Sequence, residues 1–69
     1  MSQEIRTILA DNVKFLRVKK NLKREELSLM LGFDNSYISK LEKAKVNITL
    51  DRLVKIADFF EVEPYKLLR

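Results

Sequence analysis

The sequence predicts a small all-α domain of five helices, and the spacing of apolar residues carries that prediction. Pairs such as Leu27 and Leu31 lie three or four positions apart along most of the chain, which places them on one face of a helix. No segment gives a clear strand signal. The one glycine, Gly32, and the one proline, Pro64, both fall at expected helix boundaries.

The first helix is expected from Ser2 or Gln3 to about residue 20. Asn21 follows it, and asparagine tolerates the left-handed backbone that ends many helices. The apolar stripe of this helix, which we expect to face the core, consists of Ile5, Ile8, Leu9, Val13 and Leu16.

Two short helices are expected next, over about residues 24–31 and 35–43. Gly32 can adopt the left-handed backbone that stops the first of them, and Asp34 or Asn35 can cap the second. Lys23 occupies the cap position of the earlier helix and cannot accept a backbone hydrogen bond, so we expect that end to be weakly capped. Two short helices joined by so tight a turn are the signature of a helix-turn-helix, whose second helix enters the major groove of DNA.

A fourth helix is expected after Thr49, which suits the N-cap position. Pro64 suits the first position of a short fifth helix that ends at Leu67 and Leu68. The apolar face of the fourth helix is expected to combine Leu50, Leu53, Ile56, Ala57 and Phe60.

Length and composition restrict the possible functions. With 69 residues the chain is expected to form one domain, residues 1–69. The absence of cysteine and histidine excludes disulfides, the usual soft metal sites and any Cys or His nucleophile, so we expect neither an enzyme nor a bound metal or cofactor. The sequence contains no run of eighteen apolar residues and no signal peptide, which predicts a cytoplasmic protein without a membrane partner.

Positive charge is concentrated in the first two thirds of the chain. The net charge is +4, and residues 13–24 contain six cations and no acid. A second basic cluster is formed by Lys40, Lys43 and Lys45. Solvated lysines are common on small basic proteins, but both clusters flank the expected helix-turn-helix, which favours a polyanionic partner.

Several short motifs occur in a characteristic order: Val13-Lys-Phe-Leu-Arg17, Leu22, Glu26-Leu27, Leu31-Gly32, Tyr37-Ile38-Ser39, Leu41-Glu42, Leu53, Ala57 and Leu67-Leu68. Together they resemble the phage repressor and Cro class of helix-turn-helix proteins, the xenobiotic-response-element type. The resemblance implies a compact lambda-repressor-like domain whose second and third helices form the helix-turn-helix. It extends to the controller proteins of restriction-modification systems.

The chain departs from the family at three places. Lys23-Arg24 replaces the usual Ser-Gln, Ser28 replaces a tightly packed alanine, and residues 44–48 replace a Gly-Lys-x-Asn-Pro segment. These departures affect the expected DNA contacts more than the fold.

The resemblance implies that the start and outer face of the third helix read base edges, through Asn35, Ser36, Ser39 and Lys40. Their chemistry fits, because asparagine pairs with adenine, lysine donates to guanine, and serine donates or accepts. Without the resemblance, the same residues would be read as a solvated polar face. Phosphate contacts, which position the protein without specifying sequence, are implied for Arg24, Tyr37, Lys43, Lys45 and Asn47.

The resemblance also implies a partly buried ion pair between Arg17 and Glu42, which joins the first helix to the end of the third. For Tyr37 we expect the ring to pack against the second helix or the loop, with its hydroxyl available to a phosphate. A two-fold dimer interface is expected at Phe59, Tyr65 and Leu68, although these residues can instead simply close a small core.

The predicted function is that of a sequence-specific DNA-binding transcriptional regulator, acting as a homodimer on a palindromic operator. Its expected partners are double-stranded DNA and a second copy of the chain, without a small-molecule ligand. The alternative is a protein-interaction module of the antitoxin type. Apolar residues that look exposed, namely Phe15, Leu29 and Met30, can serve that role.

Overall fold

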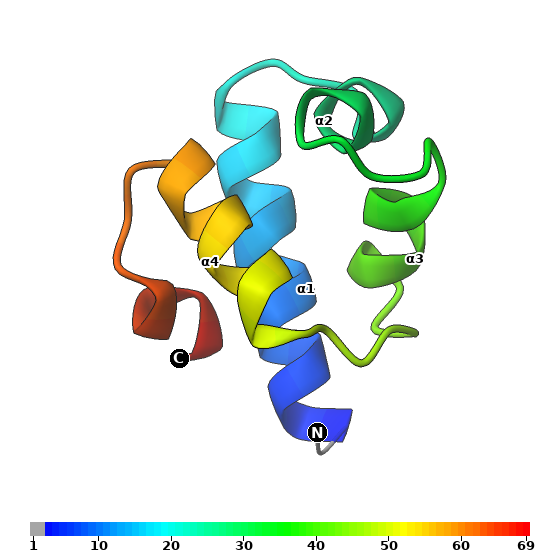
Figure 1. The fold of residues 1–69 in the computed structure, drawn as a ribbon. Coiled ribbons are helices and arrows are strands. Elements are labelled where there is room, and N and C mark those ends of the chain that lie inside the picture. The colour runs from blue at the N-terminus through cyan, green and yellow to red at the C-terminus, as the bar shows by residue number, and fades with distance from the viewer. Residues whose placement is uncertain (1–2) are drawn as a thin grey trace.

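The computed structural model describes residues 3–69 and confirms an all-helical fold, with no strand in that range. Four α-helices precede a short 3₁₀ helix: α1 (Gln3–Lys19), α2 (Arg24–Met30), α3 (Tyr37–Glu42), α4 (Leu50–Phe59) and η1 (Pro64–Leu68) (Figure 1). The fifth helix is therefore not the α-helix that the sequence predicted. Ser2, the alternative start of the first helix, lies outside the described residues.

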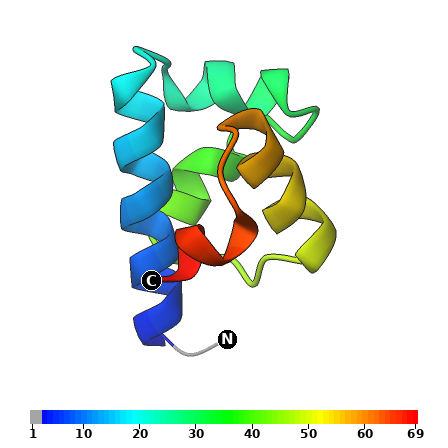
Figure 2. The ribbon, with the colours of Figure 1, turned by 90° about the vertical axis from the view of Figure 1, so that its left-hand side faces the viewer.

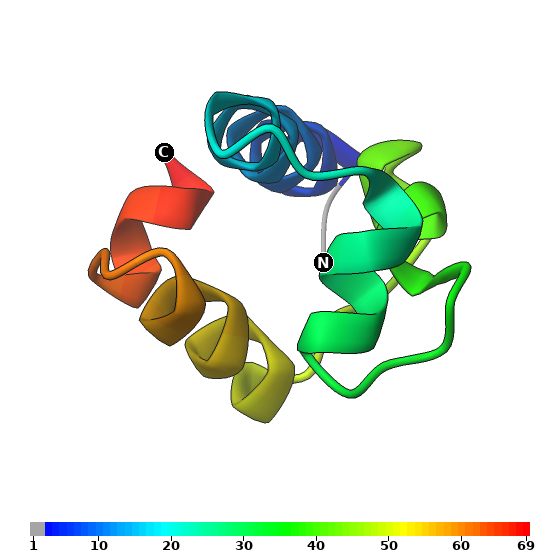
Figure 3. The same cartoon turned by 90° about the horizontal axis from the view of Figure 1, so that it is seen from above.

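The helices surround one core, with α1 on one side, α4 on the other and η1 between them (Figure 2). Seen from above, α2 and α3 form one flank of the molecule, while α4 and η1 form the opposite flank (Figure 3). Each helix buries apolar side chains in this core: Leu9, Ala10, Val13, Leu27, Leu31, Ile38, Leu41, Leu53, Ile56, Ala57, Phe60 and Leu67. No helix within residues 3–69 combines the length and apolar character needed to cross a bilayer.

Most residues of the predicted apolar stripes are buried or pack against the core, but Ile8 is only half-buried and two residues at helix starts are exposed. Ile5 is 39% exposed and Leu50 is 78% exposed, so neither belongs to the buried core. Ile5 lies in the first turn of α1, before the buried part of that helix begins at Leu9. Near the start of α4, Ile48 packs against the core, two residues before Leu50.

Two predicted helix ends are confirmed by their backbone conformations. Asn21, after α1, has φ 57° and Gly32, after α2, has φ 77°, both in the left-handed region. Gly32 donates its N–H to the carbonyl of Leu29 at 3.0 Å, and Phe33 donates to the carbonyl of Ser28 at 2.9 Å. These bonds satisfy carbonyls at the end of α2 and turn the chain sharply toward α3.

The starts of α2 and α4 are capped in different ways. Thr49 Oγ1 accepts the N–H of Arg52 at 3.2 Å, which confirms the predicted N-cap of α4. At α2 the side chain of Lys23 provides no such cap, as expected. Instead Glu26 reaches back and accepts the Lys23 N–H at 2.7 Å, a contribution that the sequence analysis missed.

The third helix begins two residues later than predicted. The N–H of Tyr37 donates to the carbonyl of Asp34 at 3.0 Å, so residues 34–37 form a tight turn rather than the first turn of an α-helix. Asn35 and Ser36 consequently lie in this turn, and α3 begins at Tyr37. The helix ends at Glu42 because Ala44 adopts a left-handed backbone with φ 59°.

The last element is a 3₁₀ helix held by α1. Lys66 donates its N–H to the carbonyl of Glu63, three residues earlier, at 3.0 Å. Asn12 Nδ2, from α1, donates to the carbonyls of Leu67 at 2.9 Å and Arg69 at 3.1 Å. Carbonyls at this end are thus bound to α1 rather than to another helical turn.

Candidate nucleic-acid interface

An open hollow of about 580 Å³ separates the start of α2 from the start of α3. Four of the predicted DNA-contacting residues line it. Arg24 comes from α2, Asn35 and Ser36 from the turn before α3, and Ser39 from α3. The residues that line the hollow are Arg17, Lys23, Arg24, Glu25, Asn35, Ser36 and Ser39. This arrangement combines amide, hydroxyl and cationic groups around one concave surface.

The four predicted base-reading residues differ in their surroundings. Asn35, Ser36 and Lys40 are exposed, whereas Ser39 is half-buried. Lys40 lies on α3 but does not line the hollow. Lys43, Lys45 and Asn47, which follow at the end of α3 and in the next loop, are exposed and also lie outside it.

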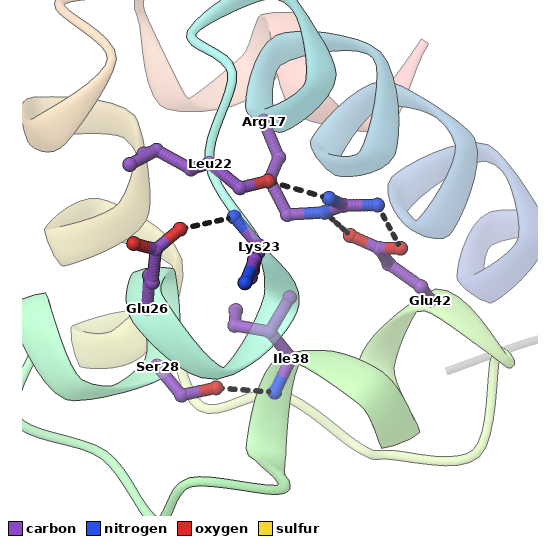
Figure 4. A network of polar contacts seen from close by, with 7 residues as sticks. All are labelled: Arg17, Leu22, Lys23, Glu26, Ser28, Ile38 and Glu42. Carbon is purple, nitrogen blue, oxygen red and sulfur yellow. Dashed lines mark hydrogen bonds and ion pairs between the residues drawn. The ribbon is translucent and has the colours of Figure 1, made fainter.

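Arg17 and Glu42 form a nearly buried ion pair between α1 and the end of α3 (Figure 4). Two guanidinium nitrogens bind the carboxylate, Nε to Oε2 at 2.6 Å and Nη2 to Oε1 at 3.1 Å. Nη1 donates to the carbonyl of Leu22 at 2.6 Å. The side chains are only 10% and 4% exposed, so each charge depends on its partner for compensation.

A second polar contact joins α2 to the start of α3. Ser28 is fully buried, and its Oγ accepts the N–H of Ile38 at 3.0 Å (Figure 4). The sequence analysis noted Ser28 only as a departure from alanine. A hydroxyl at a core position of a helix requires a hydrogen-bond partner, which is the signal that could have indicated this contact.

Tyr37 packs as expected, against the loop that follows α2. Its ring meets that of Phe33 edge to face, with centroids 4.9 Å apart. The guanidinium of Arg52, from α4, lies 4.6 Å from the Tyr37 ring centroid and 4.7 Å from that of Phe33. This cation-π contact ties the turn between α2 and α3 to α4, and nothing in the helix periodicity indicated it.

The three residues predicted at a dimer interface lie near one another in sequence but are not equally available. Tyr65 is 54% exposed, while Phe59 and Leu68 are half-buried and pack against the core. The Phe59 ring contacts that of Phe60 edge to face at 5.1 Å. Tyr65 therefore offers the largest exposed surface of the three.

Comparison with known proteins identifies the family. The family model described as helix-turn-helix matches residues 13–67, which include α2, α3 and the turn between them. The chain belongs to the helix-turn-helix family. This confirms the resemblance that was inferred from the order of its motifs.

Two curated relatives of this helix-turn-helix protein show the same relationship over nearly its whole length. A "hypothetical transcription factor" of Neisseria meningitidis is 38% identical over 66 residues, which cover 96% of this chain and 62% of the relative. The chain thus spans less than two thirds of that relative's length. "Control protein C.SmaI" of Serratia marcescens is 35% identical over 65 residues, covering 94% of this chain and 77% of the relative.

Solved structures agree with the fold. The hypothetical transcription factor NHTF from Neisseria superposes with a TM-score of 0.89 at 34% identity, covering 100% of this chain and 80% of the other. The restriction-modification controller protein C.AhdI from Aeromonas hydrophila gives a TM-score of 0.81 at 29% identity, covering 90% and 94%. The described fold is therefore shared with these two solved structures.

Replacing Glu42 with alanine tests the importance of the ion pair. Glu42→Ala leaves the Arg17 guanidinium nearly buried without its carboxylate, so we expect the free energy of unfolding to fall by about 3 to 5 kcal/mol. The melting temperature and the affinity for DNA should fall together, because α3 loses the ion pair that joins its end to α1. As a control, Asp58→Ala removes an exposed carboxylate of α4 and should change stability by no more than about 0.5 kcal/mol. Equal thermal denaturation of Glu42→Ala and the parent would contradict this account.

Proposed function

We propose that this helix-turn-helix protein is a sequence-specific DNA-binding regulator of transcription, in which α2 and α3 form the helix-turn-helix and α3 enters the major groove. The hollow that gathers Arg24, Asn35, Ser36 and Ser39 between the two helices is the observation that supports this function best. Relatives described as a transcription factor and as control proteins support the same assignment. Regulation then requires occupation of an operator, without a catalytic step or a cofactor.

The proposed base contacts follow from side-chain chemistry. Asn35 can pair bidentately with adenine, and Lys40 can donate to the N7 and O6 acceptors of guanine. Ser36 and Ser39 can donate or accept. Because Asn35 and Ser36 lie in the turn before α3, they would lead the helix into the groove, with Ser39 and Lys40 about one turn further along it.

The proposed phosphate contacts surround these residues on both sides. Arg24 is exposed at the start of α2, and Lys43, Lys45 and Asn47 are exposed beyond the end of α3. Tyr37 contributes its hydroxyl, while its ring stays packed against Phe33 and Arg52. Such contacts fix the register on the duplex and leave sequence selection to the base-reading groups.

We also propose that the protein acts as a two-fold dimer through Phe59, Tyr65 and Leu68. One short α3 reaches too few base pairs for operator-level selectivity, and a dimer doubles the number of bases that are read. In a two-fold complex the two recognition helices contact half-sites about 34 Å apart, or one turn of DNA. The operator is then palindromic.

Selection of bound sequences from random duplex DNA tests both parts of this proposal. We expect enriched sites with two inverted half-sites whose centres are about one DNA turn apart. Repeating the selection with Asn35→Ala and Lys40→Ala should change the preferred base at single positions, each costing about 1 to 3 kcal/mol of discrimination. Asp58→Ala serves again as the control and should return the parent's sequence.

The selection can contradict the base contacts, the dimer and sequence-specific binding separately. Uniform weakening at all positions by Asn35→Ala and Lys40→Ala would show that these residues contact the backbone only. Enrichment of a single unrepeated half-site would contradict the dimer. Failure of the parent to enrich any sequence would contradict sequence-specific binding.

The second candidate function is a protein-interaction module, and exposed apolar residues on α1 favour it. Phe15 is 66% exposed and Val18 is 53% exposed, and with Asp11, Lys14 and Lys19 they line another open hollow of about 580 Å³. Leu29 and Met30 on α2 are likewise 60% and 59% exposed. Exposed apolar side chains of this size can contribute contact area to a partner protein.

A pull-down with the parent and Phe15→Ser in parallel tests the second function. If protein interaction is the main role, the parent should recover a partner in stoichiometric amount, and Phe15→Ser should lose it. DNA binding by the two proteins should be equal, since Phe15 is outside the proposed DNA contacts. Recovery of no stoichiometric partner by the parent would remove this candidate function, and a partner that Phe15→Ser still binds would place the binding site away from Phe15.

A further inference from the structure

The start of α3 lacks a cap from its own N-cap residue. Ser36 has φ −100° and ψ −2°, which is a helical conformation rather than the extended one from which an N-cap side chain usually folds back. The Ser36 side chain accordingly makes no capping hydrogen bond among the described residues. The first amide, of Tyr37, is satisfied within the turn by the Asp34 carbonyl. The next amide, of Ile38, requires an acceptor from elsewhere.

That acceptor comes from the neighbouring helix. Ser28 Oγ lies 3.0 Å from the Ile38 nitrogen, ten residues further along the chain, and both residues are 0% exposed (Figure 4). Since water does not reach this position, the Ser28 hydroxyl replaces both a local cap and a solvent molecule. A hydrogen bond is directional, so it restrains rotation and sliding of α3 in a way that apolar packing alone does not.

We propose that Ser28 is a positioning residue for base reading: its hydroxyl fixes where α3 sits on α2, and thereby where the base-reading side chains project. This inference rests on the proposed function. Ile38 is bonded to Ser28, and Ser39 and Lys40 are the next two residues of the same helical turn. Asn35 and Ser36 belong to the turn that leads directly into Ile38.

The positioning role of Ser28 concerns the start of α3 only, because the ion pair between Arg17 and Glu42 holds the other end of the helix. Glu42 binds Arg17 of α1, whereas Ile38 binds Ser28 of α2, so the two ends of α3 are held by different helices. Without the Ser28 hydroxyl, the start of α3 can move while Glu42 keeps its end in place. Base-edge contacts, which require correct distance and direction, should therefore suffer more than phosphate contacts made by flexible cations.

The experiment compares Ser28→Ala with the parent on two duplexes, the selected site and an unrelated sequence. Alanine occupies no more space than serine and favours a helix, so the variant should fold, but the Ile38 amide loses its buried partner. We expect the ratio of the two affinities to fall about tenfold, comparable to one mismatched base pair, while binding to the unrelated duplex stays the same. If the substitution only unfolded part of the protein, the affinities for the two duplexes would fall by the same factor and their ratio would not change.

Two further variants complete the test. Thr49→Ala removes a hydroxyl that caps a backbone amide of α4 rather than one of α3, and should retain the parent's ratio. Ser28→Cys preserves a side chain of similar size with a weaker acceptor, and should give a ratio between those of alanine and serine. If Ser28→Ala does not fold at the temperature of the assay, the affinity ratio of Ser28→Cys serves as the test.

Hydrogen exchange supplies a readout that does not involve DNA. In Ser28→Ala the Ile38 amide should exchange faster while the buried amides of α4 keep their rates relative to the parent. An unchanged affinity ratio in both Ser28 variants would overturn the inference, even if stability falls. A parent protein that does not distinguish the two duplexes would instead overturn the proposed function.

Discussion

The shortness of α3 is the constraint on which the rest of this structure depends. A helix of six residues is far below the length at which helices are stable by themselves in water, about 12 residues or more. Its conformation must therefore be imposed by its neighbours. Ile38 and Leu41 supply buried apolar contacts, while Ser28 and Arg17 supply directional bonds at the two ends. Because these contacts form on folding, α3 does not have to be ordered when a ligand binds.

The charged residues around the hollow differ in whether their charge is compensated within the protein. Arg17 lines it, but its guanidinium is bound to Glu42 and to the Leu22 carbonyl, so its charge is largely compensated within the protein. Lys23 and Arg24 are exposed at the same hollow and remain the main cations there for an incoming anion. An arginine paired within the protein and two exposed cations therefore line the same hollow, together with the carboxylate of Glu25.

Periodicity predicted most of the fold because α1, α2 and α4 each bury a regular stripe of apolar residues. It misplaced the start of α3, since Asp34, Asn35 and Ser36 can all occupy a cap or turn position and only the tertiary structure selects among them. It also missed the 3₁₀ form of η1, where Asn12 binds carbonyls more than fifty residues away in sequence. Such contacts leave no local pattern.

The candidate site was less predictable from the sequence than the fold. The resemblance to a family supplied the Arg17 and Glu42 pair, which the structure forms, and a set of polar residues near α3, of which Asn35, Ser36 and Ser39 line the hollow. Ser28 and Arg52 were not recognised, because their partners lie on other helices and neither belongs to a repeated pattern. Side-chain contacts between different helices, such as those of Ser28 and Arg52, could therefore be identified only from the structure.

The central claim, that α3 and its flanks form the DNA-binding face, is tested most directly by nuclear magnetic resonance. Isotope-labelled protein would be titrated with its selected duplex while the backbone amide shifts are followed. The account predicts that the largest changes occur at residues 23–25 and 35–47, with the α1 surface around Phe15 and Val18 unaffected. Changes concentrated at Phe15 and Val18, with the amides of α3 unmoved, would contradict it.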